Sequence, residues 1–149
     1  MSGETSMPPA LVIARVAGTI GAQDYRVDMK ARHHALVADE RKGMGGEDAG
    51  PAPYDYLLSG LGACTVITLR MYAQRKGWPV KQIKATVHLV KGPQQESGSQ
   101  HTFVCELQLS GELDEDQRAR MLEISKACPI QRLLAKPCEV LTTLAPEKG

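Results

Sequence analysis

The sequence predicts an α+β fold, because it reads as a group of short strands, one long helix, a pair of strands and a helical end. The long helix is the clearest of these elements, since an apolar stretch runs to Lys76 and is followed by Gly77 and Pro79. With 149 residues, the chain can bury one core and is near the size at which a second copy often completes it. We expect a disordered tail at residues 1–9 and a single domain at residues 10–149.

Three strands are expected before the helix. The runs ALVIARVAG, DYRVDMKA and HHALVADE, at residues 10–18, 24–31 and 33–40, are apolar or alternate over lengths typical of strands. The segment Arg41 to Pro53 is dense in glycine and proline, which predicts a loop between these strands and the helix.

The long helix is expected from about Pro53 to about Lys76. Its first turns contain few polar residues, which predicts a helix that is buried nearly all round. Small residues stand just before Cys64, and each glycine there lowers helix stability by roughly 0.5–1 kcal/mol relative to alanine. Small residues let another backbone approach closely, and the same helix of a second subunit is a candidate for that neighbour. These small residues are Ser59, Gly60, Gly62 and Ala63.

An antiparallel strand pair is expected next. Residues 80–92 and 101–111 alternate apolar and polar side chains and are joined by a polar loop. The closing run at residues 138–145 is expected to form a last strand.

A helical segment should separate the strand pair from the last strand. Asp114 and Gln117 have the spacing of a capping box, so a helix is expected to start there. That helix must break at Pro129, which is suited to be the first residue of a new short helix. Cys128 then becomes an N-cap-like residue at the joint.

Composition disfavours several classes of partner. The net charge is +1 and the basic residues are scattered, so neither nucleic acid nor an anionic membrane is expected as a partner. The first residues lack the pattern of a signal peptide, and no segment has the uninterrupted apolar length that a bilayer requires. We expect a cytoplasmic protein, in which thiols stay reduced.

The chain contains four cysteines, Cys64, Cys105, Cys128 and Cys138. They include no C-x-x-C pair, and the histidines at residues 33–34 have no matching ligand pair, so neither a metal nor another cofactor is expected. Cys105 and Cys138 are expected to be packing residues, because an unpaired cysteine usually behaves as a small hydrophobe.

Cys128 and Cys64 differ in their expected environments. Backbone N–H groups and the positive end of the following helix would stabilise a Cys128 thiolate, so its pKa should be lowered. Cys64 lies too far inside its own helix to gain from the dipole and would need a nearby guanidinium.

Two motifs together resemble one known family. The stretch GGEDAGPAPYDYLLSGLGACTVITLRMYAQRKG, followed further along by CPIQRLL, resembles the OsmC/Ohr family of osmotically induced and organic hydroperoxide resistance proteins. The resemblance extends from about Tyr25 to the C-terminus. It implies antiparallel sheets packed around a long central helix, and an intertwined homodimer with active sites at the subunit interface.

The resemblance also implies an activity. By matching positions, Cys64 would be the attacking cysteine and Cys128 the resolving cysteine in the reduction of small organic hydroperoxides. The attacking sulfur becomes a sulfenic acid, the second thiol traps it as a disulfide, and a dithiol reductant restores both thiols. A thiol of low pKa is the better leaving group, so the reductant should attack the Cys64 sulfur and expel Cys128.

Active members of the family hold an activating arginine with a glutamate ten residues before the first cysteine. Tyr54 occupies that position here, which leaves its neighbour Asp55 as the candidate. The arginine is expected from the N-terminal strands, and Arg32 is the favoured candidate. The other candidates are Arg15, Arg26 and Arg41.

Two functions follow from these observations. The first is a thiol-dependent peroxidase that acts in defence against oxidative stress. The second is a non-catalytic dimer of the same fold that binds a small apolar ligand or serves as a redox-sensitive stress protein. The presence of both cysteines favours the first function, and Tyr54 favours the second.

Overall fold

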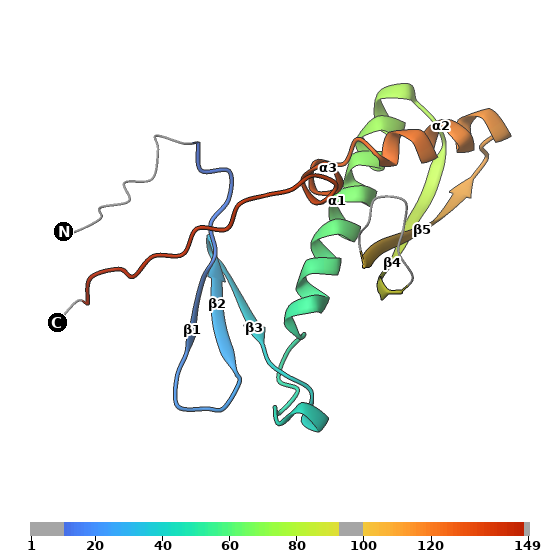
Figure 1. Cartoon of the computed structure of the whole chain (residues 1–149). Coiled ribbons are helices and arrows are strands. Elements are labelled where there is room, and N and C mark those ends of the chain that lie inside the picture. The colour runs from blue at the N-terminus through green and yellow to red at the C-terminus, as the bar shows by residue number, and fades with distance from the viewer. Residues whose placement is uncertain (1–10, 93–99, 148–149) are drawn as a thin grey trace. The chain divides into compact units, whose positions relative to one another are not determined.

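The computed structural model describes residues 11–92 and 100–147 (Figure 1). The tail expected at residues 1–9 lies outside the described residues. The chain divides into two compact units, one formed by the parts before Pro53 and after Pro137 and the other by Pro53–Pro137. The single domain expected for residues 10–149 stays a prediction, and each unit is described by itself.

The first unit contains a three-stranded antiparallel sheet of order β1-β2-β3. Its strands are β1 (Ala17–Ile20), β2 (Val27–Ala31) and β3 (His34–Ala38). In the central strand, Val27 pairs with Ile20 on one side and with Ala38 on the other. The second and third expected strands are therefore confirmed.

The first expected strand, residues 10–18, is wrong over most of its length. Only Ala17 and Gly18 belong to β1, because its ladder with the short strand β2 begins at the pair Ala17 and Lys30. Residues 11–16 belong to no ladder among the described residues and are all exposed, with Ile13 at 93%. An apolar run alone does not supply the pairing edge that a strand needs.

The last expected strand, residues 138–145, is also wrong, because the described residues after Pro137 form no regular structure. Val140 and Leu144 are 88% and 100% exposed. A strand requires a neighbour for its N–H and C=O groups, and no ladder in the described part of the chain includes this segment.

The glycine-rich loop is organised around Asp39. This side chain is 3% exposed and accepts hydrogen bonds from the backbone N–H groups of Glu40, Glu47 and Ala49 at 2.8, 3.2 and 3.1 Å. The hydrogen bond from Ala49 is the largest influence on this carboxyl, and together the three donors hold its pKa below the usual range against the effect of burial. A Cβ at Gly46 would overlap the Glu40 carbonyl, so glycine is required for this close approach. The predicted loop is confirmed, with a 3₁₀ turn η1 (Lys42–Met44) inside it.

The second unit is built on the long helix α1 (Pro53–Lys76), which runs through the centre of the view in Figure 1. It is followed by the antiparallel pair β4 (Val80–Lys91) and β5 (His101–Gly111), and then by α2 (Glu115–Ser125) and α3 (Pro129–Leu134). Helix α1 packs against β4, α2 and α3. The bounds of all these elements agree closely with the expected ones, which are thus confirmed.

The ends of these elements follow from local sequence. Gly77 adopts the left-handed conformation, at φ 68°, and its N–H binds the Gln74 carbonyl at 3.2 Å, which ends α1. At the start of α2, Asp114 accepts a hydrogen bond from the N–H of Gln117 at 2.7 Å, and the Gln117 side chain accepts one from the N–H of Asp114 at 2.9 Å. The expected capping box is thus confirmed.

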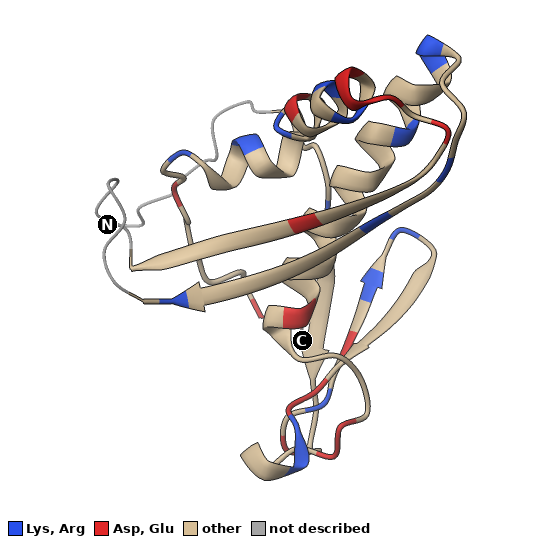
Figure 2. Cartoon of the chain, turned by 90° about the vertical axis from the view of Figure 1, so that its right-hand side faces the viewer, with Lys and Arg blue, Asp and Glu red and all other residues tan. Residues whose placement is uncertain are grey.

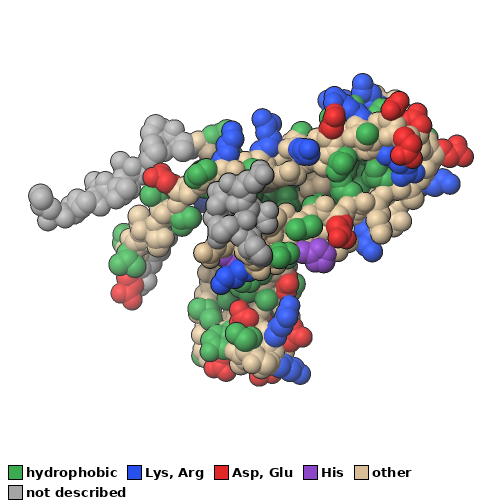
Figure 3. Space-filling model, turned by 45° about the vertical axis from the view of Figure 1, so that its right-hand side comes forward, with side chains coloured by type: hydrophobic (Ala, Val, Ile, Leu, Met, Phe, Trp, Pro, Cys, Tyr) green, Lys and Arg blue, Asp and Glu red, His purple; other side chains and the backbone are tan. Residues whose placement is uncertain are grey.

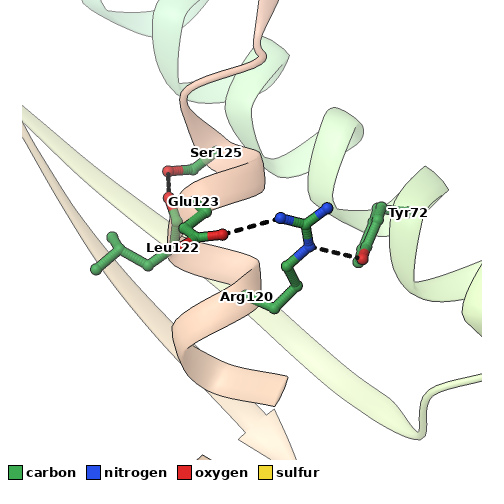
Figure 4. Close-up of polar contacts among 5 residues, drawn as sticks. All are labelled: Tyr72, Arg120, Leu122, Glu123 and Ser125. Atoms are coloured by element: carbon green, nitrogen blue, oxygen red, sulfur yellow. Dashed lines mark hydrogen bonds and ion pairs between the residues drawn. The ribbon is translucent and has the colours of Figure 1, made fainter. Parts of the chain in front are cut away.

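The core of the second unit lies on the C-terminal half of α1. Figure 4 shows how α2 is fixed there: Arg120 donates to the Tyr72 hydroxyl at 3.1 Å and pairs with Glu123 at 2.9 Å. The core cluster consists of Leu69, Tyr72, Ala73, Val80 and Met121.

Helix α1 is not buried all round, contrary to the expectation. Leu57, Ile67 and Met71 are 40%, 53% and 62% exposed. The packing of β4, α2 and α3 covers one side of the helix, and no described residue buries these three side chains on the other. By length and mean hydropathy (1.2), α1 could also cross a membrane, which the sequence analysis did not expect, although core helices of soluble proteins share this property.

One of the small residues has a close neighbour within the chain. A Cβ on Gly62 would lie 3.3 Å from Cγ2 of Val87, so strand β4 of the same chain approaches the helix there. At Gly60, no heavy atom of the described residues outside the neighbouring helix backbone lies within 4 Å of such a Cβ. Gly62 therefore serves packing within the chain, whereas a side chain at Gly60 would meet open space among the described residues, and a second subunit there stays a prediction.

Charged side chains of both signs are interspersed. Figure 2 shows acidic and basic residues alternating along α2, where Arg118 and Arg120 follow Glu115 and Asp116. On the face in Figure 3, positive and negative side chains likewise lie beside one another. This mixed pattern agrees with the scattered charges of the sequence.

Candidate active site

The candidate site lies where the joint between α2 and α3 meets α1. Helix α2 ends at Ser125, and Cys128 adopts φ −55° and ψ 125° as the N-cap of α3, with Pro129 in its first turn. The residue before a proline cannot adopt the helical conformation without strain, so the chain turns at Cys128. The expected position of Cys128 is confirmed.

The structure brings Cys64 and Cys128 into hydrogen-bonding contact. Cys64 comes from the middle of α1, and α3 packs against that helix. Cys128 is completely buried, whereas Cys64 is half-buried, and neither is in a disulfide. The two sulfurs are therefore neighbours in the fold, although they are distant in the sequence.

The environment of Cys128 favours its thiolate. Burial opposes ionisation, but hydrogen bonds outweigh it and lower the pKa of the Cys128 thiol. The donors are the Cys64 thiol, the backbone N–H groups of Gln131 and Ile130, and the Thr65 side chain. The lowered pKa confirms the expectation from the sequence.

Cys64 shows the opposite behaviour. Burial raises the pKa of its thiol, and the neighbouring Cys128 raises it further. Hydrogen bonds from the Ile130 N–H and the Thr68 hydroxyl oppose this rise without reversing it. Cys128 is therefore the thiol of the pair that loses its proton more readily, and Cys64 is the hydrogen-bond donor.

A third cysteine contributes to the same neighbourhood. Cys105 is half-buried on β5, as expected for a packing residue, and burial followed by the negative charge of Cys128 raises its pKa. Its side chain hydrogen-bonds to Thr65, which also hydrogen-bonds to Cys128. The sequence analysis did not single out Thr65 or Thr68. Thr68 follows Cys64 by one helical turn, a spacing that predicts a shared helix face.

The other candidate residues come from other parts of the chain. Asp55 is half-buried in the first turn of α1, nine residues before Cys64, which corresponds to about 13 Å along the helix axis. Arg32 lies in the first unit at the turn between β2 and β3, where its φ is 55°. The roles expected for Asp55 and Arg32 stay predictions.

The remaining arginine candidates also belong to the first unit. Arg26 forms an ion pair with Asp28 at 3.1 Å, Arg41 precedes the 3₁₀ turn, and Arg15 is exposed before β1. Tyr54, at the position where the resemblance implies a glutamate, is 67% exposed.

An open hollow of about 700 Å³ adjoins the thiol pair. Thr68, which hydrogen-bonds to Cys64, forms part of its wall, and so do Ala127 and Pro129 on either side of Cys128. Met71, Gln74 and Arg75 complete the lining. Neither cysteine itself is among the lining residues of the hollow. In the described part of the chain, no group of three or more potential ligands is placed to hold a metal ion.

Together, the fold and the site define a small α+β protein with paired thiols between a central helix and a helical joint. The chain belongs to the OsmC-like protein family, whose model matches residues 45–143. The match includes both cysteines of the pair. No curated protein sequence matches the chain.

Solved structures show the same fold. An OsmC-like protein from Mycoplasma pneumoniae aligns with a TM-score of 0.66 at 18% identity, over 82% of this chain and 86% of that one. An organic hydroperoxide resistance protein OsmC from Legionella pneumophila aligns at 0.60 and 17% identity, over 84% and 90%. An organic hydroperoxide resistance protein from Elizabethkingia anophelis aligns at 0.60 and 19% identity, over 85% and 90%.

Proposed function

We propose that this protein is a thiol-dependent peroxidase that reduces organic hydroperoxides through Cys64 and Cys128 in defence against oxidative stress. The contact between the two sulfurs carries the proposal, because a sulfenic acid formed on one can be trapped by the other without metal or haem. Membership in the OsmC-like family supports a redox or stress role. The names of the Legionella and Elizabethkingia proteins point to organic hydroperoxides as the substrate class.

We assign the first step to Cys64, and its greater exposure supports this choice, because Cys64 is half-buried and Cys128 is fully buried. The Cys128 thiolate accepts the proton of the Cys64 thiol through their hydrogen bond. The Cys64 thiolate then attacks the terminal oxygen of the hydroperoxide, a Cys64 S–O bond forms and the O–O bond breaks. The leaving alkoxide takes the proton from Cys128, which gives an alcohol, a Cys64 sulfenic acid and a Cys128 thiolate.

The second step closes the disulfide. The Cys128 thiolate attacks the Cys64 sulfur, an S–S bond forms, and hydroxide leaves and is protonated to water. A dithiol then reduces the disulfide by two exchange reactions and is itself oxidised. The lowered pKa of Cys128 favours its thiolate, which is the form that attacks the sulfenic acid.

The hollow beside the pair gives the substrate a place to bind. Met71, Ala127 and Pro129 offer apolar surface for an organic tail, while the Gln74 amide and the Arg75 guanidinium offer polar contacts. An apolar wall beside a reactive sulfur fits an alkyl or aryl hydroperoxide better than hydrogen peroxide.

The test is peroxide consumption by the purified full chain with cumene hydroperoxide and dithiothreitol. Wild type should consume the peroxide, and Cys64→Ser and Cys128→Ser should fall to the background rate. Cys138→Ser is the matched control, because Cys138 is exposed and lies in the other unit. Equal background rates for wild type and both pair variants would end the peroxidase proposal.

A non-catalytic role is the second candidate, and Tyr54 favours it. The family glutamate that holds an activating arginine is replaced by this exposed tyrosine. The protein would then bind a small apolar ligand in the same hollow or respond to oxidation as a stress protein. Binding of cumyl alcohol without any peroxide consumption above background would favour this role.

We also propose that the chain functions as a homodimer in the cytoplasm. The exposed apolar side chains of Leu57, Ile67 and Met71 on α1 are the surface that supports a second copy. Sedimentation should give a dimer at micromolar protein concentration, and a monomer would contradict the proposal.

A further inference from the structure

Arg75 is the one charged side chain in the wall of the hollow beside the thiol pair. Among the described residues that line this hollow, no other is acidic or basic. The wall comes near the two cysteines through Thr68, which follows Cys64 by one helical turn, and through Pro129, which follows Cys128 directly. An anionic group in the hollow would therefore meet one cation and no repelling carboxylate of the wall.

The guanidinium of Arg75 has no anionic partner of its own. Both ion pairs of the described residues involve other arginines, and within this part of the chain the Arg75 guanidinium makes no hydrogen bond. It packs instead against the Tyr72 ring, with Cζ 5.8 Å from the ring centroid. Arg75 is exposed, so a cation–π contact of this kind leaves its N–H donors free to bind a ligand.

Two further cations lie around the same aromatic ring. Nζ of Lys76 and Cζ of Arg120 are 5.7 and 5.9 Å from the centroid of the Tyr72 ring. Arg120 also pairs with Glu123 at 2.9 Å, which compensates its charge (Figure 4). Arg75 and Lys76 have no such partner among the described residues, so this end of α1 has a positive potential.

The spacing along α1 separates a reactive end of the hollow from a cationic end. Thr68 and Arg75 are seven residues apart on one side of the helix, which is about 10.5 Å along its axis. Cys64 lies four residues before Thr68, or about 6 Å further. Long side chains of a helix lean toward its N-terminus, and the contact of Arg75 with Tyr72, three residues earlier, agrees with this direction. The guanidinium thus extends back along the hollow toward the thiols.

We propose that Arg75 is a specificity-determining residue that selects organic hydroperoxides carrying a carboxylate, which its guanidinium binds while the peroxide group lies at the thiol pair. The inference rests on the proposed function and names the subset of hydroperoxides that the hollow prefers. A planar guanidinium offers two parallel N–H donors to the two oxygens of a carboxylate. The Gln74 amide in the same wall offers a further N–H donor.

The carboxylate takes no part in the bond changes. The O–O bond breaks at the thiol pair, the two thiols supply the electrons, and the product is the corresponding alcohol with its carboxylate unchanged. A carboxylate is ionised near neutral pH in both molecules. Because substrate and product share this group, the contact with Arg75 should strengthen the binding of both, and the product can be used to measure it without turnover.

The first test is an NMR titration of the reduced full chain, followed at the amides of Thr68 and Ala127. It compares cumyl alcohol with 4-carboxycumyl alcohol, the products of the neutral and of the carboxylated hydroperoxide. The carboxylated alcohol should bind wild type about three- to tenfold more tightly, as expected for a charged hydrogen bond in an exposed site. Arg75→Gln should remove this preference, and added salt should weaken it in wild type.

Lys76→Gln is the matched control. Lys76 lies in the same last turn of α1 and at a similar distance from the Tyr72 ring, but it is not among the lining residues of the hollow. The variant removes the same charge and should keep the preference for the carboxylated alcohol. Arg75→Lys keeps the charge without the paired donors and should retain only part of the preference.

The second test measures kcat/KM for cumene hydroperoxide and for 4-carboxycumene hydroperoxide with dithiothreitol as the reductant. Wild type should favour the carboxylated substrate. In Arg75→Gln the ratio of the two kcat/KM values should fall by about three- to tenfold, mainly through KM, because the contact is the same in the ground state and in the transition state.

Equal affinity of the two alcohols for wild type, or no binding of either, would overturn the inference. So would a preference that persists in Arg75→Gln or disappears equally in Lys76→Gln. The proposed function can fail separately: a preference in binding without consumption of either hydroperoxide would refute the peroxidase and leave Arg75 as the residue that selects an anionic ligand. Consumption of both hydroperoxides with equal kcat/KM would refute the inference alone.

Discussion

The Cys64 thiol donates a hydrogen bond to the sulfur of Cys128. The contact makes the two residues unequal, because the donor keeps its proton while the acceptor is stabilised as a thiolate. The thiol with the higher pKa is also the more exposed one, since Cys64 is half-buried and Cys128 is fully buried. The sulfur that a substrate can reach is therefore the one with the raised pKa, and the sulfur with the lowered pKa is buried.

Oxidation should join these two cysteines. One equivalent of cumene hydroperoxide should produce a peptide that links Cys64 to Cys128, because their sulfurs already touch. Tandem mass spectrometry of the digested protein measures this link. A dominant link from Cys128 to Cys105 would instead show that the strand thiol is the partner.

Reduction of the disulfide should begin at Cys64. The Cys128 sulfur has the lower pKa and leaves more readily, and Cys64 is the more accessible target. A monothiol added to the oxidised protein and quenched early should be found by mass spectrometry as an adduct on Cys64. An adduct that accumulates on Cys128 contradicts this order.

The stability of the reduced protein should depend on pH through Cys128. Its folded pKa lies below that of an unfolded thiol, so its contribution is present above about pH 8.5 and is lost as the pH falls through the folded value. The stability difference between wild type and Cys128→Ser in denaturant titrations should therefore shrink on acidification. Cys64 and Cys105 have raised pKa values and oppose this trend only at more alkaline pH. A stability difference between wild type and Cys128→Ser that grows on acidification would contradict the lowered pKa of Cys128.

Two neighbouring glycines of α1 should respond differently to alanine. A Cβ at Gly60 meets no described atom within 4 Å, so Gly60→Ala should raise stability by about 0.5–1 kcal/mol through helix propensity. Gly62→Ala should gain less or lose stability, because the new Cβ would crowd Val87. Chemical denaturation compares the two. Dissociation of a dimer by Gly60→Ala would show that a second subunit fills that space.

The glycine-rich loop offers a second matched pair. Gly46→Ala should destabilise the first unit by about 1–3 kcal/mol, because the new Cβ would overlap the Glu40 carbonyl beside Asp39. Gly43→Ala meets open space and should change stability by less than about 0.5 kcal/mol. Hydrogen exchange at the amides of Glu47 and Ala49 reports the loss of their bonds to Asp39. Equal protection of these amides from exchange in Gly46→Ala and Gly43→Ala would contradict the predicted clash at Gly46.

The sequence by itself determined the elements whose signals are local. The helix end at Gly77, the capping box of Asp114 and the turn at Cys128 depend on residues a few positions apart, and all three are confirmed. The alternation of apolar and polar side chains along β4 and β5 is also a local signal. The lowered pKa of Cys128 was predictable only in part, because the N–H groups of Ile130 and Gln131 follow it in the chain, whereas the larger influence of the Cys64 thiol comes from another helix.

Only the tertiary structure decided which elements find partners. The runs at residues 10–18 and 138–145 look like strands, but a strand exists only beside an edge that accepts it. The apolar sequence of α1 likewise did not show which of its faces the chain covers. The meeting of Cys64, Cys128 and Cys105 around Thr65 depends on the packing of a helix, a helical joint and a strand, and sequence separation carries no information about such distances.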